Sequence, residues 1–316
     1  MHELCKLLAD GQFHSGSHLG QLLGVTRAAV WKKVKKLQQQ GIQVVSQPGL
    51  GYRIPGGIRL LDHDWLRQAI DPAVMLETLL SVDSTNAVAV RKARSGEDNF
   101  LLVAEEQSNG RGRRGRQWCS PYAANLYLTY VWPVTAGVKQ IEALSLTAGL
   151  ALYQALSEYA ISGLGVKWPN DLLVGDKKIA GILIELVGDI TDRSSAVIGI
   201  GINVNVLEQP EVDQPWTSMR AELGRQLDRN QLLEQVFARL QQLLRIQADC
   251  GFAALREQWE AAHLWHERMA ILCAGDEKIT GKVLGVTDTG QLRLQVDGRE
   301  QLFAGGELSL RLQSDT

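Results

Sequence analysis

The uneven distribution of charge along this chain constrains its architecture more than any other feature. Residues 1–60 carry eight Lys and Arg against two Asp and Glu, a net charge of +6. The remaining residues carry 25 basic and 33 acidic side chains, or −8, and the two parts sum to the −2 of the whole chain. A basic head on an acidic body predicts separate folding units, of which only the head meets a polyanion. The length of 316 residues agrees with two or three domains.

The composition excludes several classes of protein. With 45% hydrophobic and 22% charged residues, an ordinary globular protein is expected. The sequence has no run of eighteen apolar residues and no secretory signal at its N-terminus, so we expect a cytoplasmic protein without a membrane span. The four cysteines lie far apart, which fits a reducing compartment and no zinc site. His263 and His266 lack the spacing of a metal motif, and a structural role is favoured for them.

The basic head has the pattern of a winged helix-turn-helix. Helices are expected over about residues 3–9, over 17–23 with Ser17 as the N-cap and Gly24 at the end, and over 26–40 with Thr26 as the N-cap. The tight turn LGVT joins the second helix to the third, which is the arrangement of a DNA-reading pair. Residues 42–54 then predict two strands around a Pro-Gly turn, and the PGG of residues 55–57 is a candidate hinge.

The third helix has an apolar face and a basic face. Val30, Val34 and Leu37 fall on one stripe, which should face the core. A run of lysines usually only solvates a surface helix, but here the run lies where a recognition helix should be, so DNA binding is favoured. We expect Arg27, Ala28 and Trp31 near base edges, and we expect phosphate contacts from Lys32, Lys35 and Lys36.

The acidic body alternates strand-like and helix-like segments. The β-rich stretches are residues 100–107, 125–132, 178–186 and 196–206, and amphipathic helices are expected over 141–160 and 228–247. This pattern predicts a mixed α/β domain. The last fifty or so residues are short alternating strands with Gly-Asp turns, which predict a small β-barrel.

Four polar clusters in the body are not required for packing. The first, DSTN at residues 83–86, is by itself more typical of a helix cap. The second, residues 105–118, contains GRGRRGR, in which four arginines and three glycines repel one another and cannot enter a core, and it is not a nucleotidase phosphate loop. The third is KWPND at 167–171. The fourth is KKIAGILIE, where Lys178 enters a buried strand and needs an acidic or ligand partner.

Together, these clusters resemble those of the bacterial biotin protein ligases that also repress biotin synthesis genes. STN, GRGRRGRQW, KWPND, KIAGIL, GIGINVN and the terminal GGELSLR occur in the family's order over essentially the whole chain. The resemblance implies an α/β (α+β) protein with three domains. These are a winged helix-turn-helix (1–58), a mixed-sheet ligase domain like that of class II synthetases (59–266), and a C-terminal SH3-like β-barrel (267–316).

The resemblance also implies a two-step reaction. Biotin and ATP give biotinyl-5'-adenylate and pyrophosphate, and biotin then passes to a lysine of the biotin carboxyl carrier protein of acetyl-CoA carboxylase. The first step brings a carboxylate to a polyphosphate, and two unit charges 4 Å apart repel by about 4 kcal/mol at an effective dielectric constant near 20. Guanidinium groups can offset this repulsion, so we expect the arginine-rich segment to bind a small-molecule anion rather than a second nucleic acid.

Site residues follow from the matched motifs. Arg113 and Lys178 are the expected catalytic residues, with Lys178 as an electrostatic stabiliser of the carboxyl oxygen and α-phosphate. The implied biotin-binding residues are Ser84, Thr85, Asn86, Gln107, Gly110, Arg111, Gly112, Arg113 and Lys178. The implied adenylate-binding residues are Arg113, Arg114, Lys178, Asn203, Trp216 and Arg311, with Glu307 assisting. Mg²⁺ is implied by the nucleotide chemistry, with Asp171 as a candidate partner. Core packing and ligand contact remain equally open for Trp168. A β-bulge and a close approach of the ligand remain equally open for Gly199 and Gly201.

A link between the two activities is expected from the arginine-rich segment. Its composition predicts disorder when empty and order around the adenylate. In the family such ordering promotes a homodimer, which places two winged helices on a two-fold symmetric operator. Two rival functions stay open at this point: a biotin-sensing repressor without catalysis, and a related acyl ligase for lipoate or an amino acid.

Overall fold

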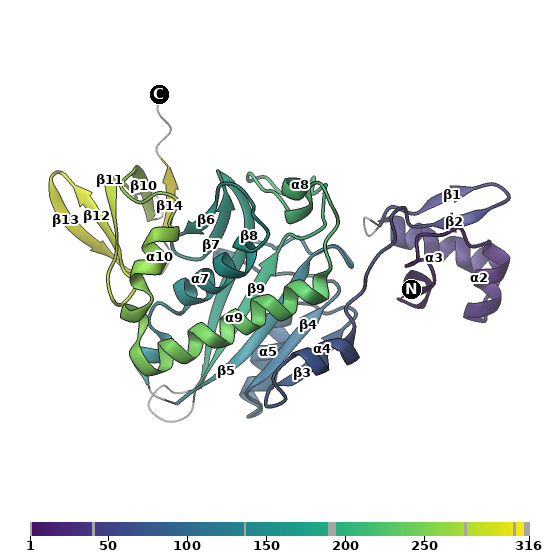
Figure 1. Ribbon diagram of the computed structural model, residues 1–316, viewed down its shortest axis with the longest axis horizontal. Helices are drawn as coiled ribbons and strands as arrows, with labels where there is room; N and C mark the ends of the chain where they lie inside the picture. Colours follow the sequence, from purple (N-terminus) through teal and green to yellow (C-terminus); the bar gives the residue numbers. More distant parts are fainter. Residues whose placement is uncertain are drawn as a thin grey trace.

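The computed structural model describes residues 2–39, 42–135, 137–188, 194–274, 277–305 and 308–312. Three units follow one another along the chain and along the long axis of the molecule (Figure 1). The N-terminal unit lies at one end, a large central unit in the middle, and a C-terminal sheet at the other end. The predicted fold class, a mixed α/β protein with a small N-terminal DNA-binding fold and a C-terminal β-unit, is confirmed.

The N-terminal unit is a helix-turn-helix with a wing. It comprises α1 (His2–Leu7), α2 (Gly16–Leu23), α3 (Arg27–Gln39), and the antiparallel hairpin β1 (Val45–Gln47) and β2 (Gly51–Arg53). Thr26 caps α3 as predicted, since its Oγ1 accepts a hydrogen bond from Ala29 N at 3.2 Å. The predicted cap of α2 was wrong: Ser15, not Ser17, accepts from His18 N at 3.1 Å. Gly24 ends α2 in the left-handed conformation, with φ of 63°.

Helix α3 presents the two faces that its sequence predicts. Val30, Val34 and Leu37 are buried, whereas Trp31 is 51% exposed. The other residues of the expected DNA-reading face are also exposed, namely Arg27, Ala28, Lys32, Lys35 and Lys36. The stripe assignment is therefore confirmed, and a basic surface without competing core contacts faces outward from the unit.

The central unit is built on a seven-stranded sheet in the order β3-β4-β5-β9-β8-β7-β6. Its strands are β3 (Met75–Leu79), β4 (Phe100–Ala104), β5 (Leu126–Val134), β6 (Leu164–Lys167), β7 (Asp171–Val174), β8 (Lys177–Gly188) and β9 (Ser194–Ile202). Among the described strands of this sheet, only β3 and β4 pair in parallel. Each of the four β-rich stretches of the sequence overlaps one of these strands, and the expected helices over 141–160 and 228–247 are α7 (Leu144–Ser157) and α9 (Arg229–Cys250).

The two faces of this sheet are covered unequally. Leu101, Val103 and Leu128 belong to the core shared with α7 and α9, whereas Phe100, Leu102 and Val131 pack with α5 (Thr85–Arg94) on the opposite face. This alternation follows the two-residue period of a strand. Because α5 covers only part of its face, the sheet beyond the N-terminus of α5 is open to other groups.

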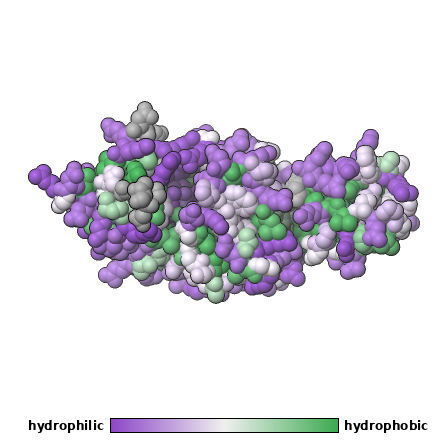
Figure 2. All heavy atoms as spheres, turned by 90° about the horizontal axis from the view of Figure 1, so that it is seen from above, coloured by the Kyte–Doolittle hydropathy of each residue, from purple (hydrophilic) through white to green (hydrophobic). Residues whose placement is uncertain are grey.

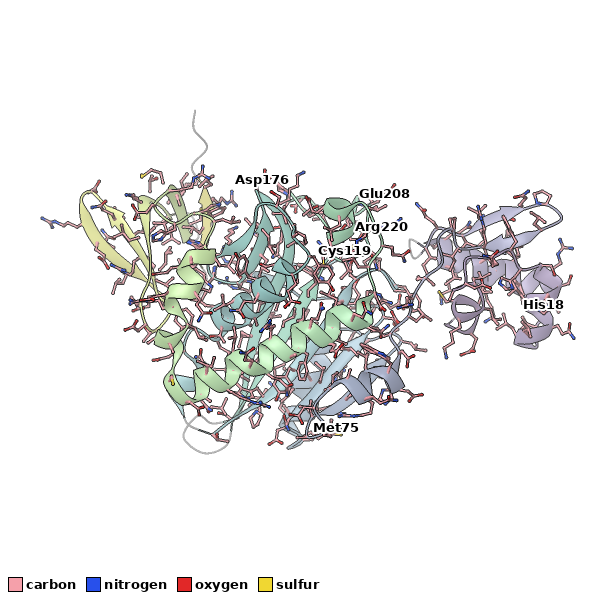
Figure 3. The ribbon with its side chains drawn as sticks, viewed as in Figure 1. His18, Met75, Cys119, Asp176, Glu208 and Arg220 are labelled. Carbon is pink, nitrogen blue, oxygen red and sulfur yellow. The ribbon has the colours of Figure 1, made fainter. Side chains whose placement is uncertain are left out.

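Smaller helices complete the central unit. They are α4 (His63–Ala69), α6 (Val138–Ile141), α8 (Met219–Leu223) and α10 (Arg256–Ala262), with short 3-10 turns at Arg113–Gly115 and Phe252–Ala254. Asp176 lies in the turn that joins β7 to β8, on the same side of the molecule as Glu208 and Arg220, whereas Met75 lies on the opposite side (Figure 3). Within the described residues, no helix is long and apolar enough to span a membrane.

The C-terminal unit is a five-stranded antiparallel sheet in the order β13-β12-β11-β10-β14. Its strands are β10 (Met269–Ala274), β11 (Glu277–Val286), β12 (Leu292–Val296), β13 (Arg299–Phe303) and β14 (Leu308–Leu312). Val283, Leu294 and Leu310 are fully buried and belong to the same core as α7 and α9. The C-terminal unit is therefore packed on the central unit rather than tethered to it.

The segment that follows the predicted hinge, residues 59–61, is held by hydrogen bonds to the central unit. The buried Arg229 donates to Arg59 O at 2.9 Å and pairs with Glu105 at 2.7 Å, and Glu105 accepts from Leu61 N at 2.6 Å. Tyr122 of the central unit lies in the hydrophobic core of the N-terminal unit. The predicted hinge at residues 55–57 is thus followed by a segment that is fixed to the central unit. Polar side chains cover most of the surface seen in Figure 2, with small apolar patches between them.

Candidate functional site

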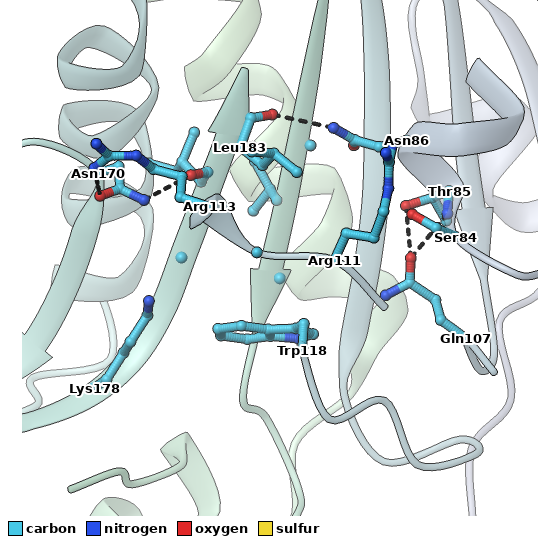
Figure 4. A pocket seen from close by; sticks show the side chains of 16 residues that line it. Ser84, Thr85, Asn86, Gln107, Arg111, Arg113, Trp118, Asn170, Lys178 and Leu183 are labelled. Carbon is cyan, nitrogen blue, oxygen red and sulfur yellow. Dashed lines mark hydrogen bonds between the residues drawn. The ribbon is translucent and has the colours of Figure 1, made fainter. Parts of the chain in front are cut away.

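A pocket of about 450 Å³, including its open mouth, lies on the sheet face that α5 covers only in part. This size suits a small ligand. Figure 4 shows it extending from Thr85 and Gln107 at one end to Asn170 and Lys178 at the other. The lining residues are Ser84, Thr85, Asn86, Gln107, Arg111, Gly112, Arg113, Trp118, Asn170, Lys178, Gly181, Ile182, Leu183, Gly199, Ile200 and Gly201. All four polar clusters of the sequence therefore meet in one place.

The closed end of the pocket is made by the start of α5. Ser84 is the N-cap residue by position, but its side chain forms no capping hydrogen bond, so the interpretation of DSTN as a simple helix cap was wrong. The Gln107 side-chain oxygen accepts from Thr85 N at 2.8 Å and from Thr85 Oγ1 at 3.1 Å. Gln107 in turn donates to Ser120 Oγ at 2.9 Å. Hydrogen bonds of Thr85 and Gln107 thus hold the backbone next to the Ser84 hydroxyl.

Asn86 anchors α5 to the sheet. Its amide nitrogen donates to Leu183 O at 3.2 Å and to Glu185 Oε2 at 3.0 Å, while its oxygen accepts from Thr129 Oγ1 at 2.8 Å. A Cβ at Gly199 would lie 1.8 Å from the Asn86 oxygen. Gly199 is therefore needed for this close approach, and the Asn86 amide is already occupied by protein partners.

Trp118 forms the floor of the middle of the pocket. A Cβ at Gly201 would lie 2.5 Å from the Trp118 ring, and one at Gly181 would lie 3.1 Å from it, so both glycines make room for the indole. The Nζ of Lys178 is 5.4 Å from the Trp118 ring centroid. An aromatic plane thus connects the closed end of the pocket to its cationic end (Figure 4).

The arginine-rich segment is a short hairpin that closes over the pocket. Trp118 N donates to Gly110 O at 2.8 Å and Gly112 N donates to Arg116 O at 2.7 Å. Gly110 does not line the pocket, but a Cβ there would lie 2.3 Å from Trp118 O, so the hairpin cannot form with a larger residue. Backbone pairing and the ion pair between Arg111 and Glu185 define this conformation of the segment.

Two arginines of the hairpin point inward. Arg111 pairs with Glu185 at 2.8 Å. Arg113 donates to Asn170 Oδ1 at 2.8 Å and to Gly305 O at 3.0 Å, so it joins the central unit to the C-terminal unit. Burial lowers the pKa of Arg113, which reflects the cost of holding a cation away from water. A bound anion would offset that cost.

Lys178 has the acidic partner that its position required. Its Nζ is 2.6 Å from Asp171 Oδ1, and both side chains are 17% exposed. Lys178 is positioned by backbone bonds on both sides, because its N–H donates to Pro215 O and its carbonyl accepts from Thr217 N. Trp216 therefore lies directly beside Lys178 as an isolated bridge partner.

Several expected ligand residues do not line the pocket. Asn203 is buried and donates to Thr217 O at 3.0 Å, so it holds the loop that carries Trp216. Arg114 is exposed with φ of 58° at the tip of the hairpin. Arg311 is exposed on β14, and Glu307 lies outside the described residues. The structure thus brings the expected biotin residues together in one pocket, except for Gly110, which supports the hairpin. Of the expected adenylate residues, Arg113 and Lys178 line the pocket and Trp216 lies beside Lys178.

Sequence reasoning assigned no role to several residues of the site. Asn170 links Arg113 to Ile182 O, and Glu185 joins Arg111 to Asn86. Trp118 follows the arginine motif, but its place depends on Gly181 and Gly201, more than sixty residues away. No local pattern could have revealed these contacts. Trp168, left open, is fully buried and donates to Gly290 O at 3.1 Å, and it borders a second cavity of about 800 Å³, including its open mouth, beside Arg113.

In the described part of the chain, no three His, Cys, Asp or Glu side chains gather in one place. His263 instead stacks on Trp259 with 4.8 Å between ring centroids. Burial lowers the pKa of His263 to about 3, so the imidazole is neutral at physiological pH.

Three regions of the chain match known families. Residues 79–203 match the biotin/lipoate A/B protein ligase family, residues 2–53 match the HTH domain, and residues 268–311 match the biotin protein ligase C terminal domain. The chain is 38% identical to the bifunctional ligase/repressors BirA of Salmonella typhimurium and Escherichia coli, over 98% of this chain and 96% of each relative.

A solved structure agrees with these matches. Biotin protein ligase from Aquifex aeolicus, in complex with biotin and ATP, superposes with a TM-score of 0.67 at 30% identity, covering 76% of this chain and 99% of that one. The chain belongs to the family of bifunctional biotin ligase/repressors.

Proposed function

We propose that this protein activates biotin with ATP and transfers it to a carrier protein, and that it represses biotin synthesis genes through its winged helix. The observation that carries the first activity is the shape and charge of one pocket. It is closed at the Ser84 end, floored by Trp118, and lined at its other end by Lys178 and Arg113. A ligand with a polar ring, an apolar chain and a terminal carboxylate fits this order of groups.

Residues at the two ends of the pocket bind different parts of the ligand. Ser84 and Thr85 hold the ring of biotin, and Arg111 and Gly112 close over its chain. The carboxylate lies toward Lys178, where the ammonium stabilises charge on the carboxyl oxygen and the α-phosphate. Arg113 retains the adenylate, and its bonds to Asn170 and Gly305 hold the guanidinium in place before the ligand arrives. Pre-set donors of this kind need no reorganisation during the reaction.

The nucleotide lies at the rim. Trp216 beside Lys178, with Asn203 holding its loop, contacts the adenine side, while Arg114 and Arg311 approach the phosphates. Mg²⁺ is commonly held by one or two carboxylates together with substrate phosphates, and Asp171 fits that requirement as the carboxylate nearest to Lys178. When bound, the ion neutralises phosphate charge.

The second step needs an amine from the partner protein. We propose that this partner is the biotin carboxyl carrier protein of acetyl-CoA carboxylase, whose lysine attacks the adenylate and releases AMP. The protein works in the cytoplasm, where the carrier, ATP and operator DNA are all present. The domain division that serves these roles is 1–58 for DNA, 59–266 for catalysis and 267–316 for the β-unit.

Repression uses the exposed face of α3. Trp31, with Arg27 and Ala28, reads base edges, and Lys32, Lys35 and Lys36 contact phosphates. The adenylate-bound protein forms a homodimer, so that two winged helices reach two half-sites of one operator. Sedimentation with and without biotin plus ATP tests this link, and a monomer in both conditions would refute it.

Transfer of radiolabelled biotin to a carrier domain tests the catalytic proposal. Label that enters the carrier only with ATP present supports a ligase, whereas adenylate-dependent DNA binding without any transfer would indicate a sensor without catalysis. Competition between biotin and lipoate in a pyrophosphate-release assay tests the alternative of a lipoate ligase, because such an enzyme would respond to lipoate and not to biotin.

A further inference from the structure

A line of facing residues extends from the pocket floor to the edge of the sheet. Gly201 on β9 pairs with Gly181 on β8, Gly181 pairs with Asp171 on β7, and Asp171 pairs with Lys167 on β6. Directly opposed residues of antiparallel strands point to the same face. The two glycines lie under Trp118, so the line passes from the pocket floor through Asp171 to Lys167 at the outermost strand.

Lys167 is held in an unusual environment for a lysine. Its Nζ is 5.0 Å from the ring centroid of Trp265, which is 7% exposed. Trp265 is brought there by the chain that leads to the C-terminal unit, since Leu264 N donates to Val166 O at 3.1 Å. An ammonium over an indole face is stabilised and oriented, but the ring supplies no compensating negative charge.

The charge around Lys167 is unbalanced. Asp171, the carboxylate opposite, lies 2.6 Å from Lys178. Among the residues that the structure describes, Lys167 forms no ion pair. The other charged groups that influence it are the cations Lys178, Arg311 and Arg116. Burial and these three cations lower the pKa of Lys167 despite Asp171, so positive charge is in excess around this lysine. Such a cluster is complementary to a compact polyanion.

The first reaction step releases a polyanion of this kind. A carboxylate oxygen of biotin bonds to the α-phosphorus of ATP, the bond from that phosphorus to the bridging oxygen of the β-phosphate breaks, and pyrophosphate leaves with the bonding electron pair. The carboxylate is placed at Lys178, on the inner side of Asp171. Pyrophosphate must leave on the side of the α-phosphorus that faces away from the carboxylate. Lys167 lies on the outer side of Asp171, away from Lys178.

We propose that Lys167, at the outer end of this line, is a binding residue for the β- and γ-phosphates of ATP and for the pyrophosphate they become. The inference rests on the proposed function. Trp265 positions the ammonium, and Asp171 separates the cation that serves the carboxylate from the cation that serves the leaving group. A lysine suits this role because its compact ammonium binds phosphate as a point charge.

Three variants test this role. Lys167→Met keeps the apolar stem on Trp265 and removes the charge, Lys167→Arg keeps the charge, and Lys177→Met is the control because Lys177 is an exposed lysine on β8. In ATP–pyrophosphate exchange, Lys167→Met should raise the half-saturating pyrophosphate concentration by about tenfold or more, since one charge-assisted phosphate contact is lost. Lys167→Arg should stay within about threefold of the parent, and the control should not change.

Two further measurements separate this role from a structural one. The dissociation constant for biotin and the single-turnover transfer from supplied biotinyl-adenylate to a carrier domain should be unchanged in Lys167→Met, because neither involves pyrophosphate. Equal losses in exchange, biotin binding and transfer would overturn the proposal, as would an unchanged pyrophosphate requirement. If the parent protein itself makes no adenylate, the proposed function fails instead.

A measurement on the unsubstituted protein covers the case in which Lys167→Met does not fold. Acetic anhydride modifies neutral lysines, and the labelled peptides are quantified by mass spectrometry with and without pyrophosphate in the presence of biotin. Pyrophosphate should protect Lys167 severalfold and leave Lys177 unprotected. Equal labelling of Lys167 in both conditions would overturn the assignment.

Discussion

Replacing Gly201 with alanine should damage biotin binding without touching any polar residue of the site. The new Cβ would lie 2.5 Å from the Trp118 ring, whereas carbon atoms in contact are about 3.5 Å apart. Trp118 would have to move by about 1 Å, and the pocket floor would move with it. Overpacking of this kind costs about 1–3 kcal/mol, and since 1.4 kcal/mol is tenfold in an equilibrium constant, biotin affinity should fall about 5- to 140-fold.

Titration calorimetry with biotin measures this loss, and thermal melting checks the fold. The matched control is Gly149→Ala on α7, under the opposite face of the sheet, where the nearest atom to the new Cβ is 3.6 Å away. Alanine is a better helix former than glycine, so this control should keep its biotin affinity and melt at the same or a higher temperature.

A double-mutant cycle assigns the effect to Trp118. In a Trp118→Ala background the new methyl group has no ring to displace, so Gly201→Ala should then cost almost nothing further. An affinity within threefold of the parent for Gly201→Ala alone would refute the packing argument. So would a loss of the same size in both backgrounds, because the clash with the indole would then not be its cause.

Three more predictions concern other parts of the molecule. Lys178→Ala should lower the rate of adenylate formation by about 10²-fold or more in a pyrophosphate-release assay, because charge that develops on the carboxyl oxygen and phosphate loses its stabiliser; near-normal rates would remove Lys178 from the mechanism. Replacing Lys32 and Lys35 with alanine should weaken operator binding and flatten its salt dependence by about two in the log–log slope, while ligation stays intact. His263 has a folded-state pKa of about 3, below the ordinary value of 6.5, so between these values the unfolded chain binds a proton that the folded protein does not. Stability should therefore fall as pH drops from about 6.5 toward 3, by up to about 1.4 kcal/mol per pH unit, and melting curves of His263→Phe should lose that component.

Much of the fold could be predicted from local patterns. The apolar stripe of Val30, Val34 and Leu37 fixed the orientation of α3, and alternating apolar runs indicated β4, β5, β8 and β9. The N-cap of α2 was misplaced by two residues because Ser15 and Ser17 are both suitable caps, and only the backbone path distinguishes them. Strand order could not be predicted, since it depends on contacts between distant segments.

The candidate site shows the same division. Motif resemblance indicated Ser84, Gln107, Arg113 and Lys178, and all four line one pocket. The structure adds the partners that hold them. Asn170 fixes Arg113, and the closed end depends on the approach of Asn86 to Gly199. These contacts join segments more than fifty residues apart, and no local spacing records them.

The different environments of the hairpin arginines are also visible only in the three-dimensional structure. Arg111 and Arg113 point into the site and have partners from other strands, whereas Arg114 is exposed at the tip. In the sequence the three are equivalent members of one repeat. Backbone geometry separates them, because Arg114 adopts φ of 58° and turns the chain.

A crystal structure with biotin and a non-hydrolysable ATP analogue tests the central claim most directly, namely that the arginine-rich hairpin and Lys178 join two mutually repelling anions. The biotin ring should lie beside Ser84 and Thr85 with its chain over Trp118, and its carboxylate and the α-phosphate should both lie within hydrogen-bonding distance of Lys178, with Arg113 over their junction. Ligands bound elsewhere, or a hairpin turned toward solvent while both are bound, would contradict it.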